Sequence, residues 1–167
     1  MRIRDSKGFT LIELLIVVAI IGIIAAIAVP GLLRARMSGN EASAIGSMRA
    51  INTAQQNYSQ QCSGYAPVLT ELKNAGSFLS PDLSSADTVA KSGYTVTMAK
   101  ASVGAVVPAP PAGCTGPVTD YFAHAEPLTV GSTGTRSFAT NSQGTIYYDP
   151  TGAAIADPIP AATKPIQ

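Results

Sequence analysis

A long apolar run near the start of the chain dominates the pattern of hydrophobic and polar positions. From Leu14 to Leu33 the chain has twenty residues without a charge, LLIVVAIIGIIAAIAVPGLL. About 20 helical residues span the roughly 30 Å hydrocarbon layer of a bilayer. The run is apolar on every side, which is typical of a helix surrounded by lipid or by protein. We therefore predict a membrane-spanning helix, whose backbone satisfies its own hydrogen bonds.

The helical pattern continues beyond the apolar run, but its character changes. Packable residues recur at alternating intervals of four and three, which places them on one face of a helix, and many of the other positions are polar. The pattern predicts one helix from about Phe9 to about Gln60, with an apolar first half and an amphipathic second half that packs on a sheet. The predicted inner face consists of Ala44, Met48, Ile51, Gln55 and Tyr58.

The rest of the chain predicts a small antiparallel sheet with loops. Alternating apolar and polar positions, bounded by turn residues, indicate three to four strands. Gly144 is expected at a positive φ in a hairpin turn. The predicted strands are 94–98, 119–126, 135–140 and 145–149, with a short helix near 69–76. The fold class is therefore α+β: one long N-terminal helix packed on a small antiparallel sheet of 3–4 strands.

Two further segments read as loops. Residues 101–117 carry four prolines, three glycines and no charge, which predicts a long, stiffened connection between strands. The tail from Asp157 is rich in proline and is expected to fray.

Composition narrows the possible functions. The chain has 167 residues and a formal net charge of +1, which leaves no strong electrostatic footprint for nucleic acid. It has one histidine, His124, and two cysteines, too few for a four-ligand zinc site. No phosphate loop, nucleophile elbow or cluster of metal ligands stands in the sequence. We therefore expect no enzyme activity, no cofactor and no metal site.

Two residues interrupt the apolar stretch. Glu13 places a carboxylate at or near membrane depth, which costs about 2.5–3.5 kcal/mol on insertion scales and indicates a functional site, unless the side chain reaches the interface. Pro30 removes one helical hydrogen bond. A mild kink is common at a proline in a membrane helix, so Pro30 by itself leaves its role open.

The segment GFTLIELLIVVAIIGIIAAIAVP closely resembles the prepilin-type N-terminal segment of type IV pilins and type II secretion pseudopilins. A short basic leader ends in Gly8, and Phe9 stands at the first mature position. Glu13, Gly22 and Pro30 also fall at positions that match the family pattern. The resemblance covers residues 1–33, about a fifth of the chain. The strand segments resemble, less specifically, the sheet of many bacterial pilins.

The resemblance implies a processing and assembly route. A prepilin peptidase would cut between Gly8 and Phe9 and methylate the new amino group of Phe9. Glu13 would then pair with the Phe9 amino group of an adjacent subunit. A buried ion pair adds little net stability but selects register, because leaving either charge unpaired is heavily penalised. Between Gly22 and Pro30 the helix would be interrupted and able to melt when the subunit leaves the membrane for a fibre.

The same resemblance implies a domain organisation. Residues 1–8 form a basic leader peptide, 9–60 the long helix with its membrane or fibre-core segment 9–33, and 61–167 an extracytoplasmic sheet domain. The basic residues of the leader favour a cytoplasmic N-terminus in the inner membrane, although Arg34 and Arg36 weaken the asymmetry. After assembly, the chain would lie in an extracellular fibre.

The implied partners follow from that route. They are identical or related pilin subunits, the prepilin peptidase, an inner-membrane platform protein and an assembly ATPase, with the membrane as the surroundings before assembly. No specific nucleic-acid site is evident in the sequence.

Cys62 and Cys114 frame the globular part. Outside the cytoplasm we expect a disulfide between them, with two free thiols as the alternative. Many family members carry a C-terminal disulfide that bounds an exposed loop. Here the first cysteine stands at the predicted helix end, so the role of that loop does not transfer to this chain.

Three functional hypotheses remain. The first is a structural subunit of a type IV pilus, with adhesion, twitching motility or DNA uptake as the processes it would serve. The second is a type II secretion pseudopilin in a short periplasmic fibre, although the calcium loop of the major pseudopilin is not visible. The third is a binding or enzyme module that only borrows the anchor, and the missing site constellation argues against it.

Overall fold

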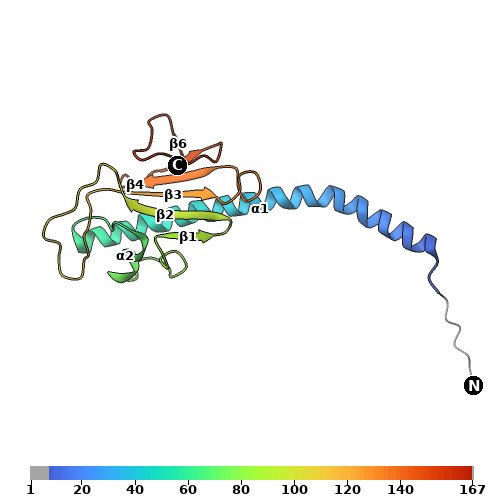
Figure 1. Cartoon of the computed structure of the whole chain (residues 1–167), viewed down its shortest axis with the longest axis horizontal. Coiled ribbons are helices and arrows are strands. Elements are labelled where there is room, and N and C mark those ends of the chain that lie inside the picture. Colours follow the sequence, from blue (N-terminus) through green and yellow to red (C-terminus); the bar gives the residue numbers. More distant parts are fainter. Residues whose placement is uncertain (1–7, 167) are drawn as a thin grey trace, which may run out of the picture. The chain divides into compact units, whose positions relative to one another are not determined.

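The computed structural model describes residues 8–166 of the chain. The elements follow in the order α1, α2 and then six strands, β1 to β6 (Figure 1). The chain forms two compact units, Met1–Ala35 and Arg36–Gln167, and helix α1 (Leu11–Cys62) contributes to both. The second unit contains the sheet. Most of the basic leader predicted from the sequence, residues 1–7, lies outside the described residues.

Helix α1 begins and ends close to the predicted positions. Thr10 precedes its first residue, and Ser63 follows its last residue with φ of 57°, a left-handed conformation that stops a helix. Within the second unit one face of α1 is buried. All five residues predicted for the inner face lie in this buried set, in which Met48, Ile51, Gln55 and Tyr58 are fully enclosed.

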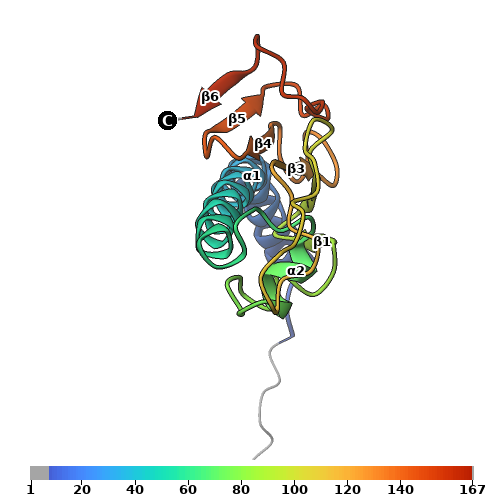
Figure 2. The same cartoon turned by 90° about the vertical axis from the view of Figure 1, so that its left-hand side faces the viewer.

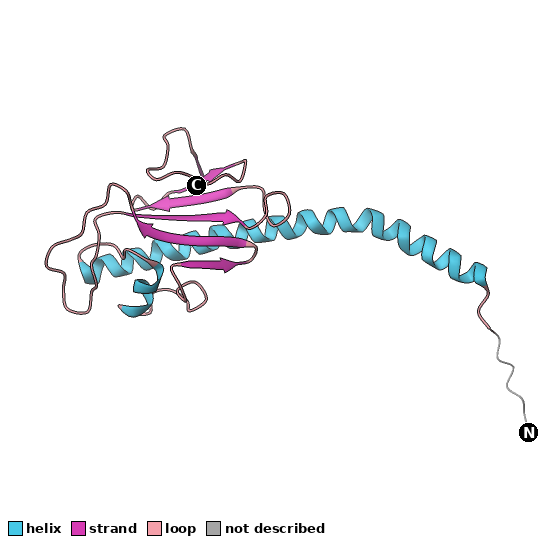
Figure 3. Ribbon diagram, viewed as in Figure 1, coloured by secondary structure: helices cyan, strands magenta, loops and turns pink. Residues whose placement is uncertain are grey.

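The six strands form one antiparallel sheet in sequence order, β1-β2-β3-β4-β5-β6 (Figure 3). The α+β class is confirmed, and the sheet has two more strands than the sequence predicted, one at each edge. The strands are β1 (Thr88–Lys91), β2 (Tyr94–Lys100), β3 (Tyr121–Pro127), β4 (Ser137–Asn141), β5 (Ile146–Asp149) and β6 (Lys164–Ile166). The short helix α2 (Leu69–Asn74) lies where the sequence predicted it.

One face of the sheet packs on α1, as the end view in Figure 2 shows. Tyr94, Val96 and Met98 point from β2 into this core, and Phe138 joins them from β4. Asn52 ties the helix to the sheet, because its Oδ1 accepts hydrogen bonds from the hydroxyls of Tyr121 (2.9 Å) and Thr140 (3.0 Å). Its Nδ2 donates to the Gly144 carbonyl at 2.8 Å. Gly144 has φ of 75° in the β4–β5 turn, as predicted.

The C-terminal segment covers part of the opposite face of the sheet. Ile155 and Ile159 pack against Phe122 and Ala139 in a second, smaller apolar cluster. The Ser137 hydroxyl donates to the Ala153 carbonyl, and the Lys164–Ile166 strand pairs with β5. The prediction that this tail frays is therefore wrong. Ile155 and Ile159 pack on an apolar patch of the sheet, and the sequence of the tail alone does not indicate that this patch exists.

Candidate assembly and processing site

The start of α1 holds the residues that the sequence singled out for processing and assembly. Gly8 and Phe9 precede the helix and are exposed. Thr10 and Glu13 form a reciprocal pair that satisfies backbone N–H groups at the helix start. The Thr10 N–H donates to Glu13 Oε2 at 2.9 Å, and the Glu13 N–H donates to Thr10 Oγ1 at 3.3 Å. The Thr10 hydroxyl also donates to Glu13 Oε2 at 2.6 Å.

This arrangement is a capping box, in which the N-cap residue and the third helical residue each satisfy the other's backbone. It gives the Glu13 carboxylate two hydrogen-bond donors within the single chain. The capping role of Thr10 was not predicted, although the sequence contains the motif that indicates it. A Thr followed three residues later by Glu, just before an apolar run, is the sequence signature of this motif.

The apolar segment of α1, residues 14–33, has a continuous hydrophobic surface. Every side chain from Gly8 to Arg36 is exposed in the single chain. The helix is long and apolar enough to cross a membrane, and none of its most apolar stretch is buried against the rest of the chain. Such a surface needs lipid or other protein around it.

Gly22 and Pro30 lie inside α1, which is continuous through both positions. This agrees with the single helix predicted from the sequence, and the interruption that the resemblance implies concerns the assembled fibre. Pro30 has no N–H, so the carbonyl four residues before it lacks its helical partner. Melting between Gly22 and Pro30 on assembly stays a prediction.

A second polar cluster fixes α1 to the sheet within the globular unit. Glu41, which is 7% exposed, lies on α1 and accepts hydrogen bonds from the start of β4. Its Oε1 accepts from the N–H (2.9 Å) and hydroxyl (2.8 Å) of Thr135, and from the Arg136 N–H at 3.3 Å. Its Oε2 accepts from Arg136 Nε at 2.9 Å and Nη2 at 2.7 Å. The guanidinium also lies 5.7 Å from the ring centroids of Phe138 and Tyr148.

Glu41 should make the globular unit acid-sensitive. Burial raises its pKa, but the hydrogen bonds from Thr135 and Arg136 outweigh burial and hold the pKa below its ordinary value of 4.5. A depressed pKa means that the stabilisation is complete above pH 4.5 and is lost as the pH falls through the lower, folded value. We expect Glu41→Gln to lower the free energy of unfolding at pH 7 by about 2 kcal/mol, because hydrogen bonds to a charged group are lost. Urea titration followed by near-UV circular dichroism measures this.

Asp82→Asn is the matched control for that measurement. Asp82 pairs with Lys91 at 2.6 Å at the surface, where Asp82 is exposed and Lys91 is half-buried, and a surface ion pair adds little. At pH 7 we expect its urea midpoint to equal that of the unmodified chain. If Glu41→Gln also left the midpoint unchanged, the cluster would not contribute to stability.

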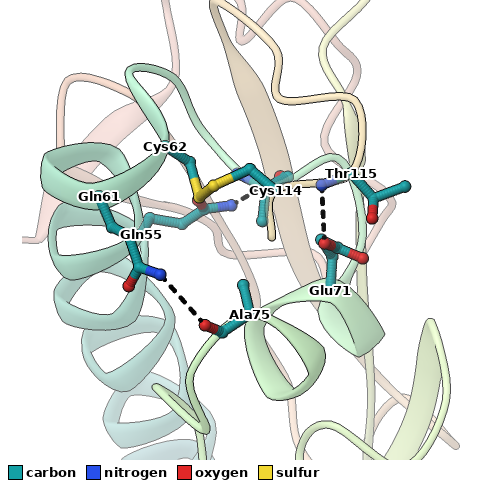
Figure 4. The surroundings of a disulfide bond; sticks show 8 residues. Gln55, Gln61, Cys62, Glu71, Ala75, Cys114 and Thr115 are labelled. Atoms are coloured by element: carbon teal, nitrogen blue, oxygen red, sulfur yellow. Dashed lines mark hydrogen bonds between the residues drawn. A yellow bond between two sulfur atoms is a disulfide. The ribbon is translucent and has the colours of Figure 1, made fainter. Parts of the chain in front are cut away.

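The two cysteines form a disulfide that joins the end of α1 to the proline-rich loop. Cys62 and Cys114 are 52 residues apart in sequence and have a Cα–Cα distance of 5.7 Å. Figure 4 shows two contacts beside it. The Thr115 N–H donates to Glu71 Oε1 at 3.1 Å, and Gln61 Nε2 donates to the Ala75 carbonyl at 3.4 Å. The disulfide therefore joins α1 to the loop, and the two hydrogen bonds link both of them to the α2 region.

Removing this disulfide should weaken the globular unit more than any single hydrogen bond. On the chain-entropy description, a cross-link closing a loop of about 50 residues contributes roughly 4 kcal/mol. We expect Cys62→Ser with Cys114→Ser to lower the free energy of unfolding by about that amount in urea. The unmodified chain with reductant should reach the same midpoint, and reductant should not shift the double variant further. Equal midpoints for oxidised and reduced chains would contradict the prediction.

Parts of the chain are similar to known proteins. Residues 3–29 match the family model described as the prokaryotic N-terminal methylation motif. Over 67 residues the chain is 40% identical to the "Type IV major pilin protein PilA" of Myxococcus xanthus, a match that covers 40% of this chain and 30% of that protein. No solved structure matches the chain.

Two further relatives match over shorter stretches. The "Type IV wide pilus major component PilA4" of Thermus thermophilus is 63% identical over 38 residues, 23% of this chain and 29% of that protein. The "Fimbrial protein" of Moraxella nonliquefaciens is 53% identical over 56 residues, 31% of this chain and 36% of that protein. The matches thus span about a third of the relatives' length. The chain thus resembles type IV pilins in its methylation motif and in the long apolar helix that contains most of that motif.

Proposed function

We propose that the chain is a structural subunit of a type IV pilus. One observation carries the proposal: a membrane-length apolar helix, exposed along its whole first half, begins directly after a Gly8–Phe9 bond that matches the processing motif. Only surroundings of lipid or of neighbouring helices cover such a surface. A subunit held first in the inner membrane and then in a fibre meets both in turn.

The subunit would enter the fibre after processing. A prepilin peptidase cuts the Gly8–Phe9 bond on the cytoplasmic side and methylates the Phe9 amino group. In the intact chain the Phe9 nitrogen belongs to a peptide bond and carries no charge. The Glu13 carboxylate instead accepts hydrogen bonds from the N–H and the hydroxyl of Thr10. Cleavage creates the amine that Glu13 of an adjacent subunit can pair with. The platform protein and the assembly ATPase would move the subunit from the membrane into the fibre.

The globular unit would form the outer surface of the fibre. Its sheet and its disulfide suit an oxidising, extracytoplasmic environment. The proposed role is structural.

Shearing whole cells tests the proposal. The released fibres are pelleted, and the intact mass of the main component is measured. We expect a chain that starts at methylated Phe9 and is lighter by two hydrogen atoms because of the disulfide. The same mature species found only in the cell envelope would point instead to a secretion pseudopilin. A chain that still starts at Met1 would contradict processing altogether.

A further inference from the structure

A polar cavity lies on the face of the sheet that points away from α1. Its volume is about 340 Å³, near the lower end of the range for small-ligand pockets. Tyr147 of β5 stands directly opposite Ala139 of β4, which belongs to the apolar cluster on that outer face. Cross-strand partners share a face, so the Tyr147 ring lies on the same side. Asp120, Asn141, Gln143 and residues 158–161 complete most of the wall.

Asp120, Asn141 and Gln143 each use one side-chain oxygen to accept a hydrogen bond from within the chain. The Ser142 N–H donates to Asp120 Oδ1 at 3.3 Å. The Gln143 N–H donates to Asn141 Oδ1 at 3.1 Å, which fixes the orientation of that amide because a backbone N–H can only donate. The Tyr147 hydroxyl donates to Gln143 Oε1 at 3.4 Å.

The other atom of each side chain has no hydrogen-bond partner among the described residues. Asp120 Oδ2 is an acceptor, while Asn141 Nδ2 and Gln143 Nε2 are donors. A hydroxyl group both donates and accepts, so the hydroxyls of one ligand can satisfy an acceptor and donors that line the same cavity. The cavity therefore presents polar groups that suit a polyhydroxylated ligand.

The charges of the wall argue against an anionic ligand and against calcium. No Lys or Arg lines the cavity, and Asp120 is its one carboxylate, so an anion meets repulsion. A single carboxylate is too few for a calcium site, which takes six to eight oxygen ligands. The rings of Tyr147, Pro158 and Pro160 supply flat apolar surface for the C–H face of a sugar ring.

We propose that this cavity binds one unit of a neutral saccharide. Asp120 Oδ2 accepts from one hydroxyl, Asn141 Nδ2 donates to a neighbouring hydroxyl, and the Tyr147 ring packs against the sugar. All of these residues belong to the globular unit, so the site exists in the single chain and does not depend on fibre assembly.

Saturation-transfer NMR on the full chain tests the proposal. The chain is held in lauryldimethylamine oxide, a detergent without a sugar headgroup, and methyl glycosides of glucose, galactose, mannose and N-acetylglucosamine are the probes. We expect transfer to at least one glycoside. Asp120→Asn should weaken its affinity roughly tenfold, because a hydrogen bond to a charged group is lost while Oδ1 still accepts from Ser142. Tyr147→Leu should weaken it as well.

Asp82→Asn makes the same chemical change outside the cavity and should leave the transfer unchanged. The urea midpoint of each variant is measured alongside, so that loss of binding is separated from loss of fold. The proposal is overturned if no neutral glycoside shows transfer, or if a stably folded Asp120→Asn chain binds as tightly as the unmodified one. Tighter binding of a neutral tripeptide, trialanine, at the same residues would also overturn it.

A second probe, soluble dextran, distinguishes two sources of the sugar. Transfer to methyl glycosides but not to dextran identifies a free sugar or a chain end as the ligand. Transfer to both identifies an internal unit of a polysaccharide. Both results support a saccharide site.

Discussion

Glu13→Gln should leave cleavage at Gly8–Phe9 intact and abolish fibre assembly. Glutamine at this position still completes the capping box with Thr10, so the start of the helix is preserved. What disappears is the negative charge that, in the proposed fibre, would pair with the Phe9 amino group of the neighbouring subunit. An unpaired charge in a dry fibre core costs about 3–5 kcal/mol, which is roughly 100-fold or more in each assembly equilibrium. Because every subunit contact repeats this loss, we expect no sheared fibres.

Thr10→Ala is the matched variant for this experiment. It removes the hydroxyl that caps the helix but keeps the Glu13 charge, and losing an N-cap residue costs about 1 kcal/mol. We therefore expect Thr10→Ala to assemble fibres, with a reduced yield. Intact mass of the membrane-bound chain checks that both variants are cleaved. Fibres from Glu13→Gln at the yield of the unmodified chain would show that the charge is not required, and Glu13→Ala should fail for the same reason.

Gly8→Leu should block processing entirely. Nothing in the fold requires glycine here, since a Cβ on Gly8 would meet no atom within 4 Å. The side chain would instead occupy the space that the peptidase needs beside the bond it cuts. We expect the full leader to remain on every chain and no fibres to form. Intact mass of the membrane fraction measures this, and an unchanged mature mass would overturn the assignment of the cleavage site.

Gly22→Ala is the control for Gly8→Leu. It shows whether loss of any glycine near the N-terminus affects cleavage, or only loss of Gly8. A Cβ on Gly22 also meets no atom within 4 Å, and alanine favours the helix by about 1 kcal/mol. Cleavage of Gly22→Ala should proceed as in the unmodified chain. If fibre formation requires melting between Gly22 and Pro30, the same variant should lower fibre yield after normal cleavage.

Much of the fold follows from patterns that are local in sequence. The apolar run from 14 to 33 is long enough to define its helix without any partner, and the spacing of Met48, Ile51 and Tyr58 marks the face that is buried. The strand β2 was found because one of its faces is buried and the other is not, so its residues alternate. These signals are strong because each rests on a single element and its period.

The edge strands and the tail were missed because their reasons are not local. None of the residues 88–91 of β1 is buried, and the sequence TVAK does not alternate apolar and polar positions. Strand β6 is three residues long with a proline at its centre. Only pairing with a neighbouring strand makes either one a strand. The C-terminal segment likewise owes its order to Phe122 and Ala139, which lie on other strands.

The candidate sites divide in the same way. Gly8, Phe9 and Glu13 stand within six residues of one another, so a sequence motif is sufficient to predict a role for them. The capping box was equally accessible, because Thr10 and Glu13 are three residues apart. Glu41 and Arg136 are separated by 95 residues, and no period or motif links them. The sugar-binding cavity joins Asp120, the β4–β5 turn and the C-terminal segment.

The sequence by itself thus determined the apolar segment, the long helix and the α+β class, and it predicts the processing position, because each depends on residues that are neighbours along the chain or along one helix face. Only the tertiary structure decided the length of the sheet, the Glu41 cluster and the outer cavity. Those features arise where distant segments meet, with α1 on one face of the sheet and the C-terminal segment on the other.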